Sequence, residues 1–236
     1  MTNRTLVNTA SRVLRHRDIW KMGFDLNGLC ATGVRYGMVA KAIEDGKIVC
    51  EAVDSFPLKP GQKLAPGTKI GALYDPDANT MFFPREDYGK ANVYEQTVIL
   101  HEATHATFDL FAKTTDDRVL GIEDESAAVL AQALYLRLCA DSDSMATHRF
   151  SMMINGPGEL ALKLVDKMMA ETGDFVRDKR TYFLRPEQTL KLRAAVAEEW
   201  NLIKETLPDG TIEDRSGVLS IYNGVVSCYS CWVHGK

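Results

Sequence analysis

The sequence predicts an α+β fold, and three observations support this prediction. Two long segments, residues 92–113 and 124–139, carry apolar side chains at helical spacing. Two short apolar runs, residues 70–74 and 80–83, flank a polar turn, which is typical of a β-hairpin. The composition, 45% hydrophobic and 25% charged in a chain of 236 residues, is that of a globular protein.

The length is enough for one domain that carries a large extra lobe. We expect a core over residues 1–140, with a small sheet and the two long helices. We expect a mostly helical C-terminal lobe over residues 141–236, packed with the core as one unit.

The first 70 residues contain one predicted helix, one ambiguous segment, one strand and one loop. Residues 8–22 have apolar positions at loose helical spacing. Residues 33–46 form either a helix that ends at Gly46 or half of a hairpin that turns there. Residues 47–53 alternate enough to predict a strand, and residues 57–69 hold three prolines and two glycines, which predict a loop.

The C-terminal lobe is expected to contain two helices and a short strand. Residues 159–171 form the first helix, and residues 186–206 form the second, with Pro186 in its first turn. The sequence Leu207-Pro-Asp-Gly210 is expected to end that helix. The strand is expected near residues 218–222.

Charge and cysteine content exclude several classes of protein. The net charge is −4, so a nucleic acid is not the expected partner, and an anionic membrane surface is disfavoured for the same reason. Apolar runs are far shorter than the roughly 20 residues that span a bilayer. Five cysteines without a signal peptide indicate reduced thiols and a cytoplasmic location, with export by a signal-less route as the alternative.

The most informative motif is His-Glu-x-x-His, with His101, Glu102 and His105 on a predicted helix. Four residues advance a helix by about 6 Å and a little more than one turn, so the two histidines share a face. Both imidazoles can then reach one metal ion. Glu102 lies about 100° around the helix, which suits a base that acts beside the metal rather than a ligand.

The motif helix is apolar on nearly all sides, so its polar groups need partners, and a metal ion would satisfy both histidines. A catalytic zinc site requires a third protein ligand. Glu125 stands at the start of the next helix, which would return it to the histidines, and Glu123 is the alternative. Asp124 is expected to cap that helix, and it could also accept a hydrogen bond from the second nitrogen of His105.

These residues resemble the gluzincin metallopeptidases, the thermolysin-like zincins. The match, H-E-x-T-H-A-x-x-D, extends past the minimal motif to Asp109, and the resemblance covers about residues 70–137. It implies a zincin-like core, one zinc ion, and hydrolysis of a peptide or protein substrate. His101, His105 and Glu125 would be the ligands, and Glu102 would take the proton of the attacking water.

The chain departs from the gluzincin pattern at two places. The family usually has Asn before its ligand Glu, and this chain has Asp124. The family has Asp four residues after that Glu, where it holds a ligand histidine, and this chain has Val129. The partner of His101 is therefore unassigned, whereas Asp124 and Asp109 are expected to support the ligands.

The resemblance also implies a donor to the oxyanion and an edge strand that pairs with the substrate. The donor would come from the C-terminal lobe, and we favour His148 and Tyr182 over Tyr222 and His234. The edge strand would be residues 79–83, with Thr80, Met81 and Phe82 in contact with the substrate. A plain core hairpin is the equal alternative.

Other functions are weaker alternatives. A non-catalytic module, in which the metal only staples two helices, would have no use for Glu102. A toxin-like peptidase that acts on one protein is compatible with the small size. A second metal site at Cys228, Cys231 and His234 lacks a fourth ligand, so an adjacent thiol pair is favoured. Metzincin and di-iron patterns do not fit, because Phe108 and Phe111 replace the Gly and the third His, and no second Glu-x-x-His occurs.

Overall fold

The computed structural model describes most of the chain and gives seven helical elements within the described part. The described residues are 3–26, 28–57, 71–111, 121–139, 157–172, 181–199 and four short strands beyond these. The helical elements are α1 Arg4–Leu14, the 3₁₀ turn η1 Ile19–Lys21, α2 Gly33–Glu44, α3 Val93–Leu110, α4 Gly121–Cys139, α6 Pro157–Thr172 and α7 Pro186–Glu199.

The strands form four small sheets. Three of the strands form one sheet in the order β2-β1-β6, and three more form another in the order β3-β5-β4, whereas β7 pairs with β8 and β9 with β10. Their bounds are β1 Gly23–Leu26, β2 Leu29–Thr32, β3 Val49–Ala52, β4 Leu73–Asp75, β5 Thr80–Phe83, β6 Tyr182–Leu184, β7 Lys204–Thr206, β8 Ile212–Asp214, β9 Ile221–Tyr222 and β10 Val225–Val226. The predicted α+β class is confirmed.

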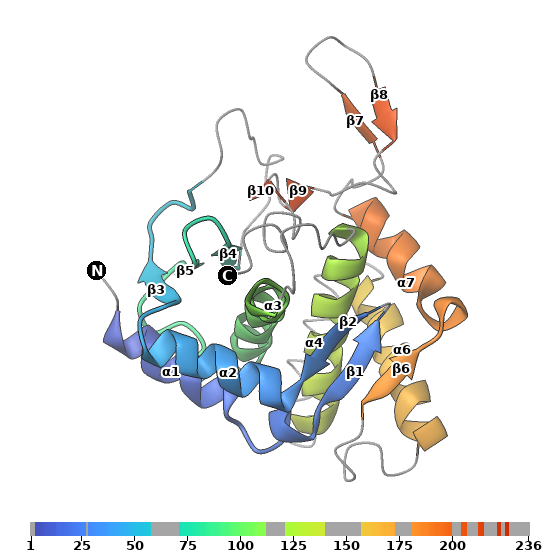
Figure 1. Cartoon of the computed structure of the whole chain (residues 1–236), viewed down its shortest axis with the longest axis horizontal. Coiled ribbons are helices and arrows are strands. Elements are labelled where there is room, and N and C mark those ends of the chain that lie inside the picture. Colours follow the sequence, from blue (N-terminus) through green and yellow to red (C-terminus); the bar gives the residue numbers. More distant parts are fainter. Residues whose placement is uncertain are drawn as a thin grey trace.

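Helix α3 is the central element of the molecule (Figure 1). It contacts α1 and α2 on one side and α4 on another, and α4 in turn packs against α6 and α7. Its described residues are buried along nearly the whole length, as the apolar sequence predicts. Helix α3 therefore carries the motif residues into the interior.

The N-terminal segments form a helix pair and resolve one ambiguity. Residues 33–46 form helix α2 rather than a hairpin, and Gly46 follows it with a φ of 71°. The predicted helix over residues 8–22 is divided, because α1 ends at Leu14 and η1 begins at Ile19. Residues 15–18 are all polar, so a helix through them would have no face to bury.

The described C-terminal part holds two helices but more strand than expected. Helix α6 agrees with the prediction, whereas α7 ends at Glu199 and residues 204–206 form β7 instead of continuing the helix. The sequence Pro208-Asp-Gly210, expected to end this helix, lies outside the described residues; the strands described on either side of it, β7 and β8, pair with each other. Strand β6 pairs in parallel with β1, so the C-terminal part shares a sheet with the N-terminal part.

The predicted hairpin exists, but its second strand is not an edge. Strand β5 pairs in parallel with β3 and antiparallel with β4, so it is the middle strand of its sheet. The predicted edge strand at residues 79–83 is therefore wrong, and the core hairpin is correct. Since the backbone of Thr80, Met81 and Phe82 faces a strand on each side, it cannot pair with a bound peptide.

The described helices include none that is both long and apolar enough to cross a bilayer.

The contact between η1 and α2 gives a test of the packing. A Cβ on Gly33 would lie 2.5 Å from the Cα of Trp20 and 2.6 Å from the carbonyl oxygen of Ile19. Both neighbours are backbone atoms, so Gly33→Ala should lower the free energy of unfolding by about 1–3 kcal/mol. Urea unfolding would measure this loss.

Gly37→Ala is the matched control, because its Cβ would meet only the tip of the Trp20 ring, at 3.2 Å. An added methyl group in a helix interior is favourable by up to about 1 kcal/mol. We expect this variant to be as stable as the parent protein or more stable. Equal losses in the two variants would contradict the described packing.

Candidate metal centre

The candidate site lies between helices α3 and α4, which run antiparallel. Residues later in α4 contact residues earlier in α3: Asp124 contacts His105, Gln132 contacts His101, and Tyr135 contacts Gln96. The interface thus carries a row of polar contacts inside an otherwise apolar core.

The two histidines of the motif and Glu125 of α4 come together in this interface. One ligand atom from each of His101, His105 and Glu125 lies within 4.8 Å of the others. The Nε2 atoms of His101 and His105 are 3.5 and 3.6 Å from the two carboxylate oxygens of Glu125. All three residues are buried, and Glu125 has no exposed surface. This group could hold a metal ion.

The carboxylate of Glu125 gives the clearest sign that a cation belongs here. Neither of its oxygens has a hydrogen-bond partner within the described part of the chain, although both are buried. A buried carboxylate without hydrogen bonds is costly. A cation bound between this carboxylate and the two Nε2 atoms would satisfy it, so the residues present fit a metal ion.

The Nε2 atom of each histidine, which faces Glu125, is called here the inner nitrogen, and Nδ1 the outer nitrogen. Each outer nitrogen has its own partner on α4. His105 Nδ1 lies 2.7 Å from Asp124 Oδ2, and His101 Nδ1 lies 2.9 Å from Gln132 Oε1. Helix α4 begins at Gly121, so Asp124 lies inside the first turn and is not the cap. Of the two predicted roles for Asp124, the structure shows the contact with His105.

Electrostatics at the site reflect crowded buried acids. Burial raises the pKa of Glu125 well above its ordinary value; His105 opposes this rise, and Asp124 and Glu102 add to it. Burial alone would lower the pKa of His105, but the facing Asp124 and Glu125 carboxylates raise it above the ordinary value. Without a cation, the site therefore favours a proton on Glu125 and a proton on His105.

Glu102 is held beside the histidines by the neighbouring sheet. Its Oε2 accepts a hydrogen bond from the backbone N–H of Tyr74 on β4, at 2.8 Å. Glu102 is buried like the histidines. Strand β4 therefore fixes the orientation of the residue that the sequence assigns as the base.

Asp109 is linked to the same residue of β4. The Tyr74 hydroxyl donates to Asp109 Oδ2 at 2.6 Å and lies 3.2 Å from Asn79 Oδ1. Tyr74 thus contacts α3 twice, through its backbone near the middle of the helix and through its hydroxyl near the end. The described contact ties Asp109 to the sheet, and support of a ligand by Asp109 stays a prediction.

Other predicted residues lie elsewhere. Glu123 pairs with Arg193 of α7 at 3.3 Å, so it is not the third member of the group. The Tyr182 hydroxyl donates to Glu171 at 2.5 Å and accepts from Gln188 at 2.7 Å. Tyr182 lies on β6, separated by β1 from β2, and β2 contacts α3. Tyr182 is therefore engaged at the α6–α7 junction and not at the centre.

Five further residues that the sequence singled out have no described side chain. His148, Cys228, Cys231 and His234 lie outside the described residues, and Tyr222 is described only as part of strand β9.

Sequence reasoning missed Gln132 and Tyr74. Gln132 follows Glu125 by seven residues, which is two helical turns, so helical spacing could have indicated that the two share a face. Tyr74 carried no comparable signal, because its contact with Glu102 is made by the backbone.

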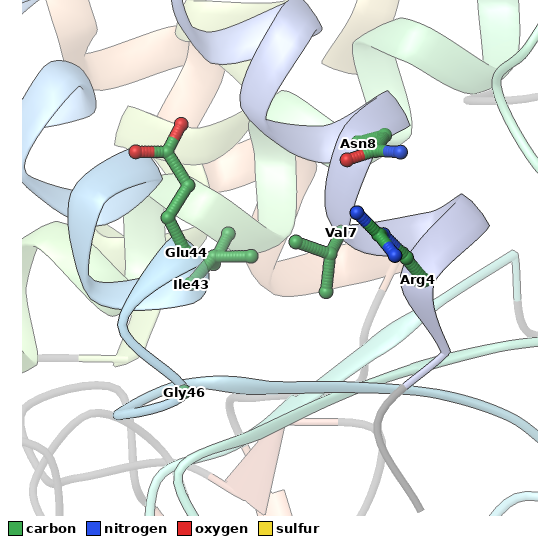
Figure 2. Close-up of a pocket in the computed structure, with 6 residues that line it drawn as sticks. All are labelled: Arg4, Val7, Asn8, Ile43, Glu44 and Gly46. Carbon is green, nitrogen blue, oxygen red and sulfur yellow. The ribbon is translucent and has the colours of Figure 1, made fainter.

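A pocket of about 340 Å³ lies between α1 and α2 (Figure 2), and its lining includes no residue of the candidate centre. Its one acidic residue, Glu44, already holds Arg15 by two hydrogen bonds of 2.8 and 3.1 Å. The pocket offers no cluster of metal ligands, so the chemistry points to the α3–α4 interface instead. The lining residues are Arg4, Val7, Asn8, Ile43, Glu44 and Gly46.

Comparisons with protein-family models, with curated proteins and with solved structures found no match to this chain. The assignment of the site therefore rests on its residues and their geometry.

Metal binding should stabilise the protein. Zinc at about a hundred times its Kd would add about 2.7 kcal/mol to the free energy of unfolding, which raises the melting temperature by roughly 5–10 °C for a chain of this size. Thermal unfolding with added zinc and with chelator would measure the shift.

Glu125→Gln should abolish the zinc-induced shift, and without metal it should be at least as stable as the parent protein, because it removes a buried acid. Glu86→Gln, at an exposed position, is the control and should keep the full shift. Absence of any shift in the parent protein would contradict the metal centre.

The double attachment of Tyr74 can be tested by removing its hydroxyl. Tyr74→Phe leaves the buried Asp109 carboxylate without this donor, and a hydrogen bond to a charged group contributes about 1.5–3 kcal/mol. Urea unfolding should show a loss of that size. Tyr182→Phe is the control, because its acceptor Glu171 is exposed, and its loss should be smaller. A Tyr74→Phe protein as stable as the control would contradict a supporting role.

Proposed function

We propose that this protein is a zinc metallopeptidase of the gluzincin type with a zincin-like core. The observation that carries the proposal is the buried group of His101, His105 and Glu125, with Glu102 next to it on α3. The arrangement that supports it is the motif helix α3, the second helix α4 that brings Glu125 to the histidines, and strand β4 beside Glu102.

The donor set favours zinc. Two imidazole nitrogens and one carboxylate are the protein ligands of many catalytic zinc sites. His101, His105 and Glu125 supply the same three groups here. When bound, zinc would supply Lewis acidity to a water molecule and to a substrate carbonyl.

The chain's own residues would orient the ligands and move the proton. Asp124 and Gln132 hold the outer nitrogens of the two histidines, so the inner nitrogens face Glu125. Glu102, fixed by the Tyr74 N–H, would accept the proton of the attacking water and deliver it to the leaving amine. The substrate would be a peptide or protein rather than a nucleic acid, and a cytoplasmic location stays part of the proposal.

A substitution at Glu102 separates catalysis from metal binding. Glu102→Gln keeps an acceptor for the Tyr74 N–H but cannot take a proton, so kcat/KM on a peptide panel should fall by about 10²–10⁴. Elemental analysis should still find stoichiometric zinc in this variant, whereas His101→Ala should lose it.

Glu86→Gln again serves as the exposed control and should keep both zinc and activity. Full activity in Glu102→Gln, or a zinc-loaded parent protein that cleaves no peptide in the panel, would refute the peptidase.

A second candidate function is a non-catalytic module in which the metal only joins α3 to α4. The burial of His101, Glu102, His105 and Glu125 favours it, because structural zinc sites are closed. Strand β4, the edge strand of the β3-β5-β4 sheet that contacts α3, is also buried at Leu73 and Tyr74. A peptide hydroxamate would bind the zinc-loaded protein only at an open coordination position. Failure to bind, together with bound zinc, would favour the module.

A further inference from the structure

A chain of buried hydrogen bonds leads from His101 to the backbone of α3. His101 Nδ1 lies 2.9 Å from Gln132 Oε1, and Gln132 Nε2 donates to Thr97 Oγ1 at 3.3 Å. The Thr97 hydroxyl donates to the carbonyl oxygen of Tyr94 at 2.6 Å. Gln132 and Thr97 are 3% and 0% exposed, so water does not compete for these bonds.

The direction of each bond in this chain is fixed by the carbonyl at its end. A backbone carbonyl only accepts, so the Thr97 hydroxyl uses its proton there and presents lone pairs to Gln132. Only the NH₂ group of Gln132 can face those lone pairs, which turns its Oε1 towards His101. Because Oε1 only accepts, the proton of a neutral His101 ring resides on Nδ1.

We infer that Gln132 is a positioning residue that, oriented by Thr97, holds His101 in the Nδ1–H form and directs its Nε2 lone pair towards Glu125. The inference rests on the proposed metal centre and names what completes it. The ring has no other tautomer that keeps the bond to Gln132 Oε1. Without the amide, the His101 ring would no longer be held in one tautomer or in one orientation.

The local charge explains why an amide, and not a carboxylate, accepts the hydrogen bond from His101. Glu102, Asp124 and Glu125 are three buried acids around the two histidines. A fourth carboxylate facing His101 would add another buried negative charge. The place four residues after Glu125 holds Val129, and Gln132, one turn further, supplies a neutral acceptor instead. The two histidines therefore have unlike partners, a carboxylate at His105 and an amide at His101.

The tautomer can be measured without any metal. Nitrogen-15 NMR of the metal-free protein, at a pH where the ring is neutral, should show His101 with its proton on Nδ1. Gln132→Met keeps the size of the side chain but removes the acceptor, and should release His101 to a mixture of tautomers. Thr97→Val should also weaken the preference, because the amide is then free to turn, whereas Thr97→Ser should keep it.

Metal affinity is the second readout. In competition with a chelator, Gln132→Met should raise the Kd for zinc at least about tenfold, the usual effect of losing such a support. Gln132→Glu keeps an acceptor at this place, so its Kd for zinc should stay within a few-fold of the parent protein, whereas the added buried charge should lower the melting temperature of the metal-free protein. Tyr135→Phe is the matched control in the same interface: it removes a hydrogen bond of 3.0 Å to Gln96 and should change neither the tautomer nor the Kd.

The outcomes separate this inference from the proposed function. A parent protein that binds no zinc refutes the proposed function, and the NMR result still tests the role of Gln132 by itself. A parent protein that binds zinc with the same Kd and the same His101 tautomer in Gln132→Met overturns the inference. If Gln132→Met does not fold, Thr97→Val decides by the same two measurements, and an unchanged tautomer and Kd in that variant overturn the inference.

Discussion

The central constraint in this structure is the burial of two imidazoles and several carboxylates between α3 and α4. Charged groups leave water only at a large cost, and they are retained in an interior when partners or a cation compensate. Asp124 and Gln132 compensate the outer sides of the histidines, whereas the inner side is left to Glu125, whose oxygens lack hydrogen bonds in the described part. The Nδ1 atoms of both histidines therefore have partners, whereas the space between the Nε2 atoms and Glu125 is suited to a cation.

The surrounding fold holds α3 in register for this purpose. Thr104, between the two histidines, donates to the carbonyl of Leu100 and bonds to the Tyr36 hydroxyl of α2 at 2.8 Å each. The threonine of the motif thus anchors α3 to α2. Burial raises the pKa of Tyr36, so this hydroxyl remains protonated and keeps its bond.

The main helices and the grouping of ligands could be predicted because both depend on local periodicity. Helix α3 is long and strongly apolar, and the spacing of His101 and His105 led to the same pair that the structure brings together with Glu125. The role of Asp124 depended on where α4 begins, and helix boundaries are weakly encoded, so the sequence left two roles open.

The predictions that failed concern residues whose neighbours are distant in the sequence. Alternation within residues 79–83 predicts a strand but not its neighbours, and the parallel partner β3 lies on the far side of residues 53–72 in the sequence. Gln132 was missed because its contact with His101 depends on the offset between the two antiparallel helices, and helical spacing within α4 alone does not give that offset. Tyr182 has the right chemistry for a donor, but its hydrogen bonds to Glu171 and Gln188 arise from the packing of α6 against α7.

The hairpin that supplies no ligand nevertheless determines the geometry of the motif. Tyr74 reaches Glu102 through its N–H and Asp109 through its hydroxyl, so one residue of β4 holds two points of α3 that are seven residues apart. Strand β4 is itself held by β5, and β5 by β3. Because the proposed role of Glu102 requires it to stay beside His101, the three-strand sheet would support the site as directly as α4 does. The same contact also restrains α3 against rotation, which would separate both histidines from α4.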